Sequence, residues 1–313
     1  MYRPSIIIPT YNRPRELTDC IASLLKQTVP PFEIIVVDDG NLPEIPLEDQ
    51  CRQAGILCRY HKKDTPGLTE SRNAGIRMAQ GDILFFLDDD VVLRPDYLEA
   101  ILEVYHEHAG ERLGGVGGLI ENTPPLRRRD YLKRGVELIF LAYGFSEGKV
   151  LPSGFCVQFG ETPFPIRQIK QVDFLMGGVC SFPRWIFDEF TFTDRYRRFG
   201  LGEDKDFTLQ VSARYPLYVT PRAQLLHLEA PAMRPDKRRW GRLFLLGNFL
   251  LFKNHVCKHP WQWLFFWYAT FGYVLARMLA LLVFPNRGKR EQLLGTFDAI
   301  RAIANREVVL SKA

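Results

Sequence analysis

The stretch Gly81-Asp82-Ile83-Leu84-Phe85-Phe86-Leu87-Asp88-Asp89-Asp90 decides the fold, because it joins a buried strand to concentrated charge. The apolar, aromatic run predicts a strand, and the three carboxylates follow at its C-terminal end, where open α/β sheets bind ligands. Carboxylates packed this closely repel one another unless a cation joins them. Oxygen ligands suit Mg²⁺ or Mn²⁺, so the triplet predicts a metal site, with an acidic turn after a strand as the alternative.

The first 90 residues alternate between strand-like and helix-like segments. Strands are expected at 5–9, 33–37 and 56–60, helices at 12–25 and 68–79, a further strand at 115–120 and an irregular loop or hairpin at 151–172. Asn12 is expected to cap the first helix, with Pro14 in its first turn. Strands separated by helix-length segments favour an α/β fold with a doubly wound, mostly parallel sheet.

Polar residues also follow the first two strands of this sheet. The first strand ends in Pro9-Thr10-Tyr11-Asn12, and the second ends in Asp38-Asp39-Gly40. Because the carboxyl ends of parallel strands meet at one edge, these groups are expected to lie near the aspartate triplet. Such convergence is typical of a binding site rather than of a core.

Composition excludes several classes of protein. The 313 residues are 46% hydrophobic and 25% charged, which is ordinary for a globular chain and argues against disorder. The net charge is +5, with basic clusters at 127–134, 234–242 and 287–301 that suit phosphates or anionic lipid surfaces. No nucleic-acid module accompanies them, so no nucleic-acid partner is expected. The six cysteines show no metal-ligand spacing and, with no signal peptide before the first strand, indicate a reducing, cytosolic environment.

The last third of the chain is strongly apolar. Residues 261–284 are long enough to span a bilayer, but Arg277 lies well inside them and both flanks are basic. The preferred interpretation is a helical hairpin on the cytoplasmic face of the cell membrane, peripheral or monotopic. The alternatives are a single span and a helix buried in a soluble core or dimer. The expected division is a catalytic domain over 1–232 and a helical, membrane-associating region over 233–313.

Five ordered motifs resemble those of glycosyltransferase family 2 over roughly residues 4–230. They are Ser5-Ile-Ile-Ile-Pro-Thr-Tyr-Asn12, Val36-Val37-Asp38-Asp39-Gly40, Ser71-Arg72-Asn73-Ala74-Gly75, Leu87-Asp88-Asp89-Asp90-Val91 and Gly202-Glu203-Asp204-Lys205-Asp206. The resemblance implies an inverting enzyme with a Rossmann-like nucleotide-sugar domain and Mn²⁺ or Mg²⁺ as cofactor.

The resemblance also implies roles for individual residues. The nucleotide sugar would contact Pro9, Thr10, Tyr11, Asp39, Arg72, Asp88, Asp89, Gly177 and Gly178. The metal would be held by Asp88, Asp90 and His227, although a lone histidine in an apolar run also occurs as a core residue. The catalytic base would be Asp204, with Glu203 as its alternative or as an orienting group. An acidic first turn stabilised by the helix dipole would explain the same pair without catalysis.

The chemistry of sugar transfer agrees with these roles. Breaking a sugar–phosphate bond places negative charge on the departing diphosphate, which a divalent ion neutralises, and the acceptor hydroxyl needs a base. The expected function is transfer of a sugar from a nucleoside diphosphate to a glycan or lipid-linked acceptor at the membrane surface. Two alternatives stay open, namely a sugar-nucleotide-forming nucleotidyltransferase and an inactive nucleotide-sugar-binding scaffold.

Overall fold

The computed structural model describes residues 2–43, 47–193, 202–229 and 235–308. The chain forms two compact units. The first comprises Met1–Thr123, Ile166–Asp194 and Glu203–Ala232, and the second comprises Pro124–Pro165, Arg195–Gly202 and Met233–Ala313. Each unit has its own apolar core.

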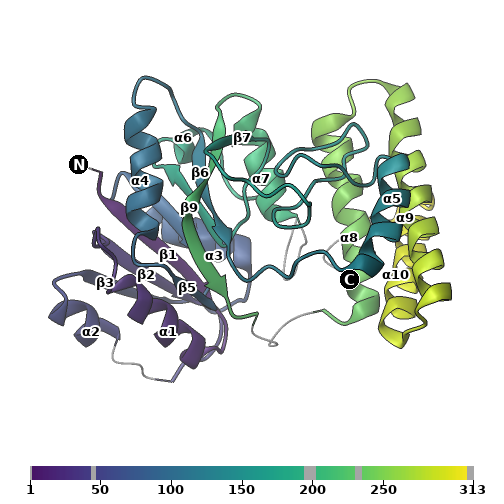
Figure 1. Cartoon of the computed structure of the whole chain (residues 1–313). Coiled ribbons are helices and arrows are strands. Elements are labelled where there is room, and N and C mark those ends of the chain that lie inside the picture. Colours follow the sequence, from purple (N-terminus) through teal and green to yellow (C-terminus); the bar gives the residue numbers. More distant parts are fainter. Residues whose placement is uncertain (1, 44–46, 194–201, 230–234, 309–313) are drawn as a thin grey trace. The chain divides into compact units, whose positions relative to one another are not determined.

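The first unit is built on one mixed sheet (Figure 1). Its strands are β1 Pro4–Thr10, β2 Glu33–Asp38, β3 Leu57–Lys62, β4 Ile83–Leu87, β5 Val91–Leu93, β6 Gly115–Ile120, β7 Lys170–Val172, β8 Val179–Pro183 and β9 Leu217–His227. Across the described residues the order is β3-β2-β1-β4-β8-β6-β9-β5, with β7 paired to β9. The predicted α/β class is confirmed.

The parallel part of the sheet is the part that the sequence pattern predicts. β3, β2, β1 and β4 are all parallel neighbours, and β6 is parallel to β9. The contacts of β8 with β4 and β6, and of β9 with β5 and β7, are antiparallel. This antiparallel part was not predicted, because pairing between distant short strands leaves no local signal.

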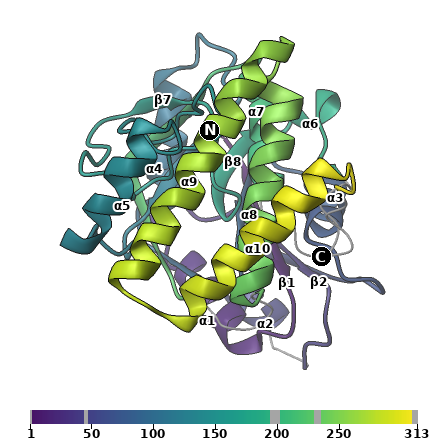
Figure 2. The same ribbon diagram turned by 90° about the vertical axis from the view of Figure 1, so that its right-hand side faces the viewer.

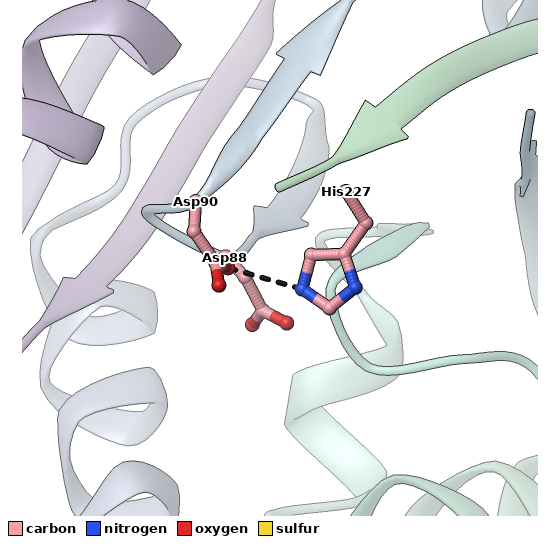
Figure 3. Close-up of side chains that lie close together, drawn as sticks. All are labelled: Asp88, Asp90 and His227. Carbon is pink, nitrogen blue, oxygen red and sulfur yellow. Dashed lines mark hydrogen bonds and ion pairs between the residues drawn. The ribbon is translucent and has the colours of Figure 1, made fainter. Parts of the chain in front are cut away.

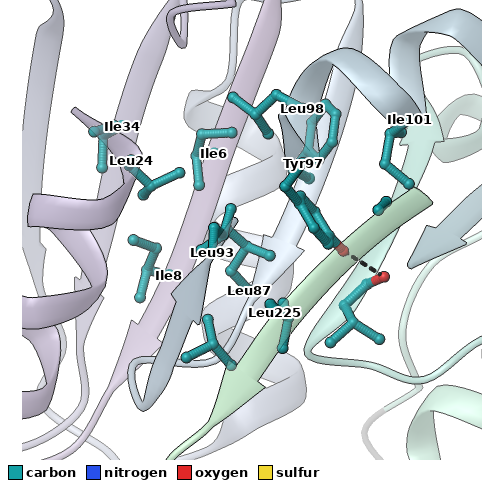
Figure 4. Close-up of a cluster of buried hydrophobic side chains, with 14 of the residues drawn as sticks. Ile6, Ile8, Leu24, Ile34, Leu87, Leu93, Tyr97, Leu98, Ile101 and Leu225 are labelled. Carbon is teal, nitrogen blue, oxygen red and sulfur yellow. Dashed lines mark hydrogen bonds between the residues drawn. The ribbon is translucent and has the colours of Figure 1, made fainter. Parts of the chain in front are cut away.

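Helices cover both faces of the sheet in the first unit. They are α1 Pro14–Leu24, α2 Leu47–Gln53, α3 Leu68–Met78, α4 Tyr97–Glu107, α6 Ile186–Glu189 and α7 Glu203–Ser212. Alternate residues of β1 face opposite sides, so Ile6 and Ile8 join the core with α1 and α4 while Ile7 meets α3. Figure 4 shows Ile6, Ile8 and Tyr97 in this core, where the Tyr97 hydroxyl donates to the Val179 carbonyl over 2.9 Å.

The start of α1 differs from the prediction. Pro14 is in the first turn as expected, but Arg13 and not Asn12 is the capping residue, and it makes no side-chain cap. Asn12 has a φ of 53°, in the left-handed region that asparagine tolerates. Its side-chain carbonyl instead accepts from the backbone N–H of Asn41 over 2.6 Å, which ties together the loops after β1 and β2.

The second unit is helical. It contains α5 Arg128–Ile139, α8 Lys237–Leu251, the π-helical turn η2 Phe252–Val256, the 3-10 turn η3 Pro260–Gln262, α9 Trp263–Val283 and α10 Arg287–Ala304. α10 packs along α8 and also on α9, while α5 packs on α9 (Figure 2). Residues 151–165 are irregular, as expected, apart from a bridge between Val150 and Cys156.

The units differ from the expected division at residue 232. Residues 124–165, predicted to belong to the catalytic domain, pack with the C-terminal helices. The reason is a long-range contact, since Arg277 of α9 donates to the buried Glu137 of α5 over 2.8 Å. No pattern within 124–165 reveals this partner.

The packing of α3 on β1 yields a stability prediction. A Cβ on Gly75 would overlap the side chain of Ile7. Gly75→Val should therefore lower the free energy of unfolding by about 2 kcal/mol, although valine is a better helix former than glycine. Urea unfolding of the purified chain measures this loss. Gly110→Val is the control, because nothing lies within 4 Å of its Cβ position, and an equal loss in both variants would contradict the overlap.

Candidate functional site

The candidate site lies where β1, β4 and β9 of the first unit end. Asp88, Asp89 and Asp90 connect β4 to β5. β5 pairs antiparallel with β9, and Val91 lies opposite His227. The register therefore brings the end of β9 beside the aspartate turn, from 137 residues away in the chain.

Three potential metal ligands meet at this point. The ligand atoms of Asp88, Asp90 and His227 all lie within 4.8 Å of one another. Figure 3 shows the His227 ring directed at Asp90, with Nε2 3.0 Å from Oδ1. Asp90 is 3% exposed, whereas Asp88 reaches solvent. The two carboxylates and one imidazole predicted from the sequence are thus brought together.

The backbone of His227 is fixed by a residue that sequence reasoning missed. Asn122 accepts from the His227 N–H over 3.0 Å and donates to its carbonyl over 2.8 Å. The N–H of Leu228 also donates to the Asp90 carbonyl over 2.8 Å. Asn122 lies two residues past the predicted strand 115–120, and a polar residue near a strand end is the signal that could have identified it.

Asp89 points into the protein. Its carboxylate accepts from the Thr10 hydroxyl over 2.7 Å and from the Arg13 guanidinium over 2.9 Å. Burial raises the pKa of Asp89 to about 6, although the bond from Thr10 and the charge of Arg13 act against this rise. Two predicted sugar contacts, Thr10 and Asp89, therefore bind each other here. Arg13, which also lies 3.4 Å from Asp90, was not predicted.

A buried arginine connects the aspartate turn with the acidic start of α7. Arg72 is 2% exposed and lies 3.8 Å from Asp88 and 3.3 Å from Glu203. Asp204 accepts from the backbone N–H of Gly177 over 3.1 Å and from that of Lys205 over 2.8 Å. The structure thus brings Arg72 and the two candidate catalytic bases, Glu203 and Asp204, close to Asp88.

The predicted glycines lie where no side chain would fit. A Cβ on Gly178 would overlap the carboxylate of Asp88. A Cβ on Gly177 would lie 2.7 Å from Arg72 and 3.0 Å from Asp204. Both glycines therefore permit close approach, and the groups that approach them are the site's own carboxylates and guanidinium.

The remaining predicted contacts lie at the ends of β1 and β2. Pro9 is buried in β1 beside Val37, and Tyr11 is half-buried just beyond the strand. Asp39 accepts from the Gly67 N–H over 3.0 Å and the Ser71 hydroxyl over 2.6 Å, and it pairs with Lys63 over 3.0 Å. Asp39 thus ties β2 to the start of α3.

The charge of the site favours a cation. Five carboxylates gather there, from Asp88, Asp89, Asp90, Glu203 and Asp204, against the guanidinium groups of Arg13 and Arg72. Desolvation of the partly buried Asp88 raises its pKa, although the charges of Arg72 and His227 act against this rise. Two carboxylates and an imidazole suit Mn²⁺, and Mg²⁺ would use the same oxygens. The donor set therefore fits the predicted ion.

Glu203, the first residue of α7, has a raised proton affinity. Burial, together with the adjacent charge of Asp204, raises the pKa of Glu203 to about 7 from an ordinary value of 4.5, against the opposing effect of Arg72. Glu203 therefore exchanges a proton near neutral pH. Groups with this property serve in general acid–base catalysis.

Comparisons of sequence point to one family. Residues 5–143 match the model described as Glycosyl transferase family 2. An uncharacterized glycosyltransferase of Haemophilus influenzae is 38% identical over 104 residues, or 33% of this chain and 35% of that protein. A glucosyl-dolichyl phosphate glucuronosyltransferase of Haloferax volcanii is 27% identical over 107 residues, or 33% of this chain and 34% of that protein. The chain thus matches about a third of the length of these relatives.

Comparisons of structure agree on the fold. S. aureus TarS 1–349 aligns with a TM-score of 0.53 and 13% identity, over 98% of this chain and 82% of that one. GalNAc-T7, solved with UDP, GalNAc and Mn²⁺, aligns with a TM-score of 0.60 and 15% identity, over 81% of this chain and 48% of that one. At these identities the likeness shows the fold alone, and it confirms the expected Rossmann-like architecture.

The raised pKa of Glu203 predicts a pH-dependent effect on stability. The folded protein binds this proton more tightly than the unfolded chain does, so ionised Glu203 lowers stability above pH 7 and not below pH 4.5. Glu203→Gln should raise the free energy of unfolding by roughly 1–3 kcal/mol at pH 8, and much less at pH 5. Urea unfolding in EDTA at both pH values measures the difference.

The exposed Glu107→Gln is the control for this experiment. It should change stability by a similar small amount at pH 5 and pH 8. An equal effect of Glu203→Gln at both pH values would show that Glu203 ionises as it does in water.

Proposed function

We propose that this protein is an inverting glycosyltransferase, because residues 5–143 match the model described as Glycosyl transferase family 2. It moves one sugar from a nucleoside diphosphate to an acceptor hydroxyl. The observation that carries this proposal is the Asp88–Asp90–His227 group, with ligand atoms within 4.8 Å of one another and Arg72 between Asp88 and Glu203. The potential metal ligands and the potential base thus belong to one charged network.

The leaving-group side of the reaction belongs to the aspartate turn. Asp88, Asp90 and His227 hold Mn²⁺ or Mg²⁺, which neutralises charge on the departing diphosphate when bound. Asn122 keeps His227 in place through two backbone hydrogen bonds. Arg13 compensates the charge of Asp89 and Asp90, so that the turn tolerates three adjacent carboxylates.

The acceptor side belongs to the start of α7. An acceptor oxygen attacks the anomeric carbon, the bond from that carbon to the diphosphate breaks with its electron pair, and Asp204 takes the hydroxyl proton. The N–H groups of Gly177 and Lys205 orient the Asp204 carboxylate and leave each oxygen a free lone pair. Glu203, paired with Arg72, positions the acceptor and acts on the neighbouring Asp204 through its charge.

The nucleotide lies across the ends of β1 and β2 in this proposal. Pro9 and Tyr11 line the base, and the half-buried ring of Tyr11 offers a stacking face. Asp39 receives the base, since its oxygens have lone pairs beyond those used by Gly67, Ser71 and Lys63. Thr10 lines the base with Pro9 and Tyr11, and Asp89, Gly177 and Gly178 complete the sugar side.

A membrane surface is the proposed location of the second unit. Pro260–Val283 has the length and hydropathy of a span, with a mean hydropathy of 1.5. Phe266, Ala269, Tyr273 and Ala276 pack inward, whereas an opposite stripe is exposed. That stripe comprises Leu264, Tyr268, Phe271, Met278 and Leu282, from 44% to 79% exposed. One buried and one exposed apolar face suit a helix lying on the membrane, and here we place it on the cytoplasmic face.

A lipid-linked acceptor follows from this location. The relative from Haloferax volcanii is named for a dolichyl phosphate-linked sugar. We extend that acceptor class, a lipid-linked or cell-surface glycan precursor, to this chain.

Donor hydrolysis tests the activity. The purified chain with Mn²⁺ should slowly release one nucleoside diphosphate from a panel of sugar nucleotides, and EDTA should abolish this. Asp90→Asn should remove the metal-dependent rate, whereas Asp204→Asn should lower transfer to an acceptor by about 10²–10⁴-fold and leave donor binding intact. Asp19→Asn, at an exposed position of α1, is the control.

Three outcomes would contradict parts of this proposal. Donor binding without turnover in the wild type would favour an inactive scaffold. Synthesis of a sugar nucleotide from a sugar phosphate and a nucleoside triphosphate would favour a nucleotidyltransferase. Loss of transfer in Glu203→Gln with activity retained in Asp204→Asn would exchange the roles of the two acids.

Vesicle sedimentation tests the membrane location. The chain should sediment with vesicles of 70% phosphatidylcholine and 30% phosphatidylglycerol and be released by alkaline carbonate. Phe271→Glu with Leu282→Glu should weaken binding more than tenfold, because each charge enters the exposed stripe. Leu57→Glu, at an exposed leucine of β3, is the matched control. Retention after carbonate would show a span, and no sedimentation would favour a soluble helix.

A further inference from the structure

The second unit contains a cavity that the proposed reaction does not use. It has a volume of about 590 Å³ and lies between α5, the C-terminal half of α9 and the start of α10. We call it the α5–α9 cavity. Its size is within the range of small-molecule sites.

The cavity has an apolar wall and a cationic rim. Val136, Leu279, Ala280 and Val283 supply aliphatic surface. Lys133, Arg277 and Lys289 supply positive charge, and Asp130 is the carboxylate among the lining residues. Asp130 is already engaged, since it accepts from the Arg127 N–H over 3.0 Å at the start of α5.

The cationic side chains at the cavity carry more positive charge than the buried carboxylate of Glu137 neutralises. Glu137, 1% exposed, is shared by Arg277 at 2.8 Å, Arg134 at 3.0 Å and Lys133 at 3.8 Å. Arg134 also pairs with Glu161. Lys133 thus has the longest contact to a carboxylate that two guanidinium groups already occupy. Burial, with the charge of Arg277, lowers the pKa of Lys133 to about 8, as expected for an ammonium group short of anions.

We propose that the α5–α9 cavity binds the phosphate of a long-chain lipid phosphate ester, with the alkyl or prenyl chain against its apolar wall. Lys133 and Lys289 contact the phosphate, and Arg277 adds its charge while remaining paired to Glu137. The wall leads outward, because Val283 and Phe284 line the cavity and are both about half exposed. A chain leaving the cavity therefore meets the apolar surface beside Leu282.

A lipid phosphate ester matches the cavity better than inorganic phosphate or an uncharged amphiphile does. Inorganic phosphate would leave the aliphatic wall exposed to water, and an uncharged amphiphile would leave the cationic rim without an anion. The phosphate ester itself has two sources, a membrane phospholipid, whose phosphate is a diester, and a lipid phosphate without a glycan, whose phosphate is a monoester. Binding requires neither donor nor turnover, so it is tested separately from glycosyl transfer.

Calorimetric titration of the whole chain tests the proposal. Decyl phosphate, a monoester, and dihexanoylphosphatidylglycerol, a diester, are each added below their micelle concentration. At least one should bind, with decyl maltoside and inorganic phosphate at least tenfold weaker. Lys133→Gln and Lys289→Gln should each weaken binding about fivefold, as expected for one lysine near a lipid phosphate.

Two further variants separate the cavity from the general surface. Ala280→Trp fills the apolar wall and should abolish binding. Lys253→Gln removes an exposed lysine of the same unit outside the cavity and should leave binding unchanged. Thermal unfolding of each variant shows whether it is folded, and the two conservative lysine changes leave the side chains of Glu137 and Arg277 in place.

The outcomes are distinct. Tighter binding of decyl phosphate identifies a lipid phosphate monoester, and tighter binding of the phosphatidylglycerol identifies a membrane phospholipid; both support the cavity as a lipid phosphate site. The proposal is overturned by binding of neither probe, by equal binding of decyl maltoside or inorganic phosphate, or by affinities unchanged in both lysine variants.

Discussion

The candidate site depends on one buried guanidinium. Arg72 is 2% exposed and lies between Asp88, which follows β4, and Glu203, which starts α7. An uncompensated buried charge costs several kcal/mol, and Asp88 and Glu203 are carboxylates that lie near the buried charge of Arg72. Gly177 leaves the room that Arg72 needs. Residues 131 positions apart share this contact, which links the aspartate turn to the acidic start of α7.

The division of labour among the three aspartates follows from where each carboxylate points. Asp89 is turned inward to Thr10 and Arg13, and its charge is compensated within the protein. Asp88 and Asp90 face His227, with Arg72 3.8 Å from Asp88 and Arg13 3.4 Å from Asp90. A strand that ends in a tight turn separates adjacent side chains in this way. As a result, Asp89 is bound within the protein, and Asp88 and Asp90 on either side of it can act as metal ligands.

The second unit also contains a buried charge that is paired with an opposite charge. Glu137 is buried and forms an ion pair with Arg277. This pairing allows a charged side chain within the otherwise apolar helix α9. Sequence reasoning treated Arg277 as evidence against a simple span, and its buried partner is consistent with a helix packed on one face. The surplus of cations around Glu137 then leaves positive charge at the α5–α9 cavity. Charge burial thus shapes both units.

The sequence by itself determined the strands β1 to β4, the aspartate triplet at the end of β4 and the helix with Pro14 in its first turn, because each depends on neighbours within one strand or turn. The resemblance to a known family added His227, Arg72 and the pair at 203–204, which local patterns alone would not connect. Only the tertiary structure decided that Arg13 and Asn122 support the site, that Asp89 points inward, and that residues 124–165 join the C-terminal helices. Each of these depends on a contact between residues distant in the chain, or on the direction of a side chain, and neither property is contained in local composition or periodicity.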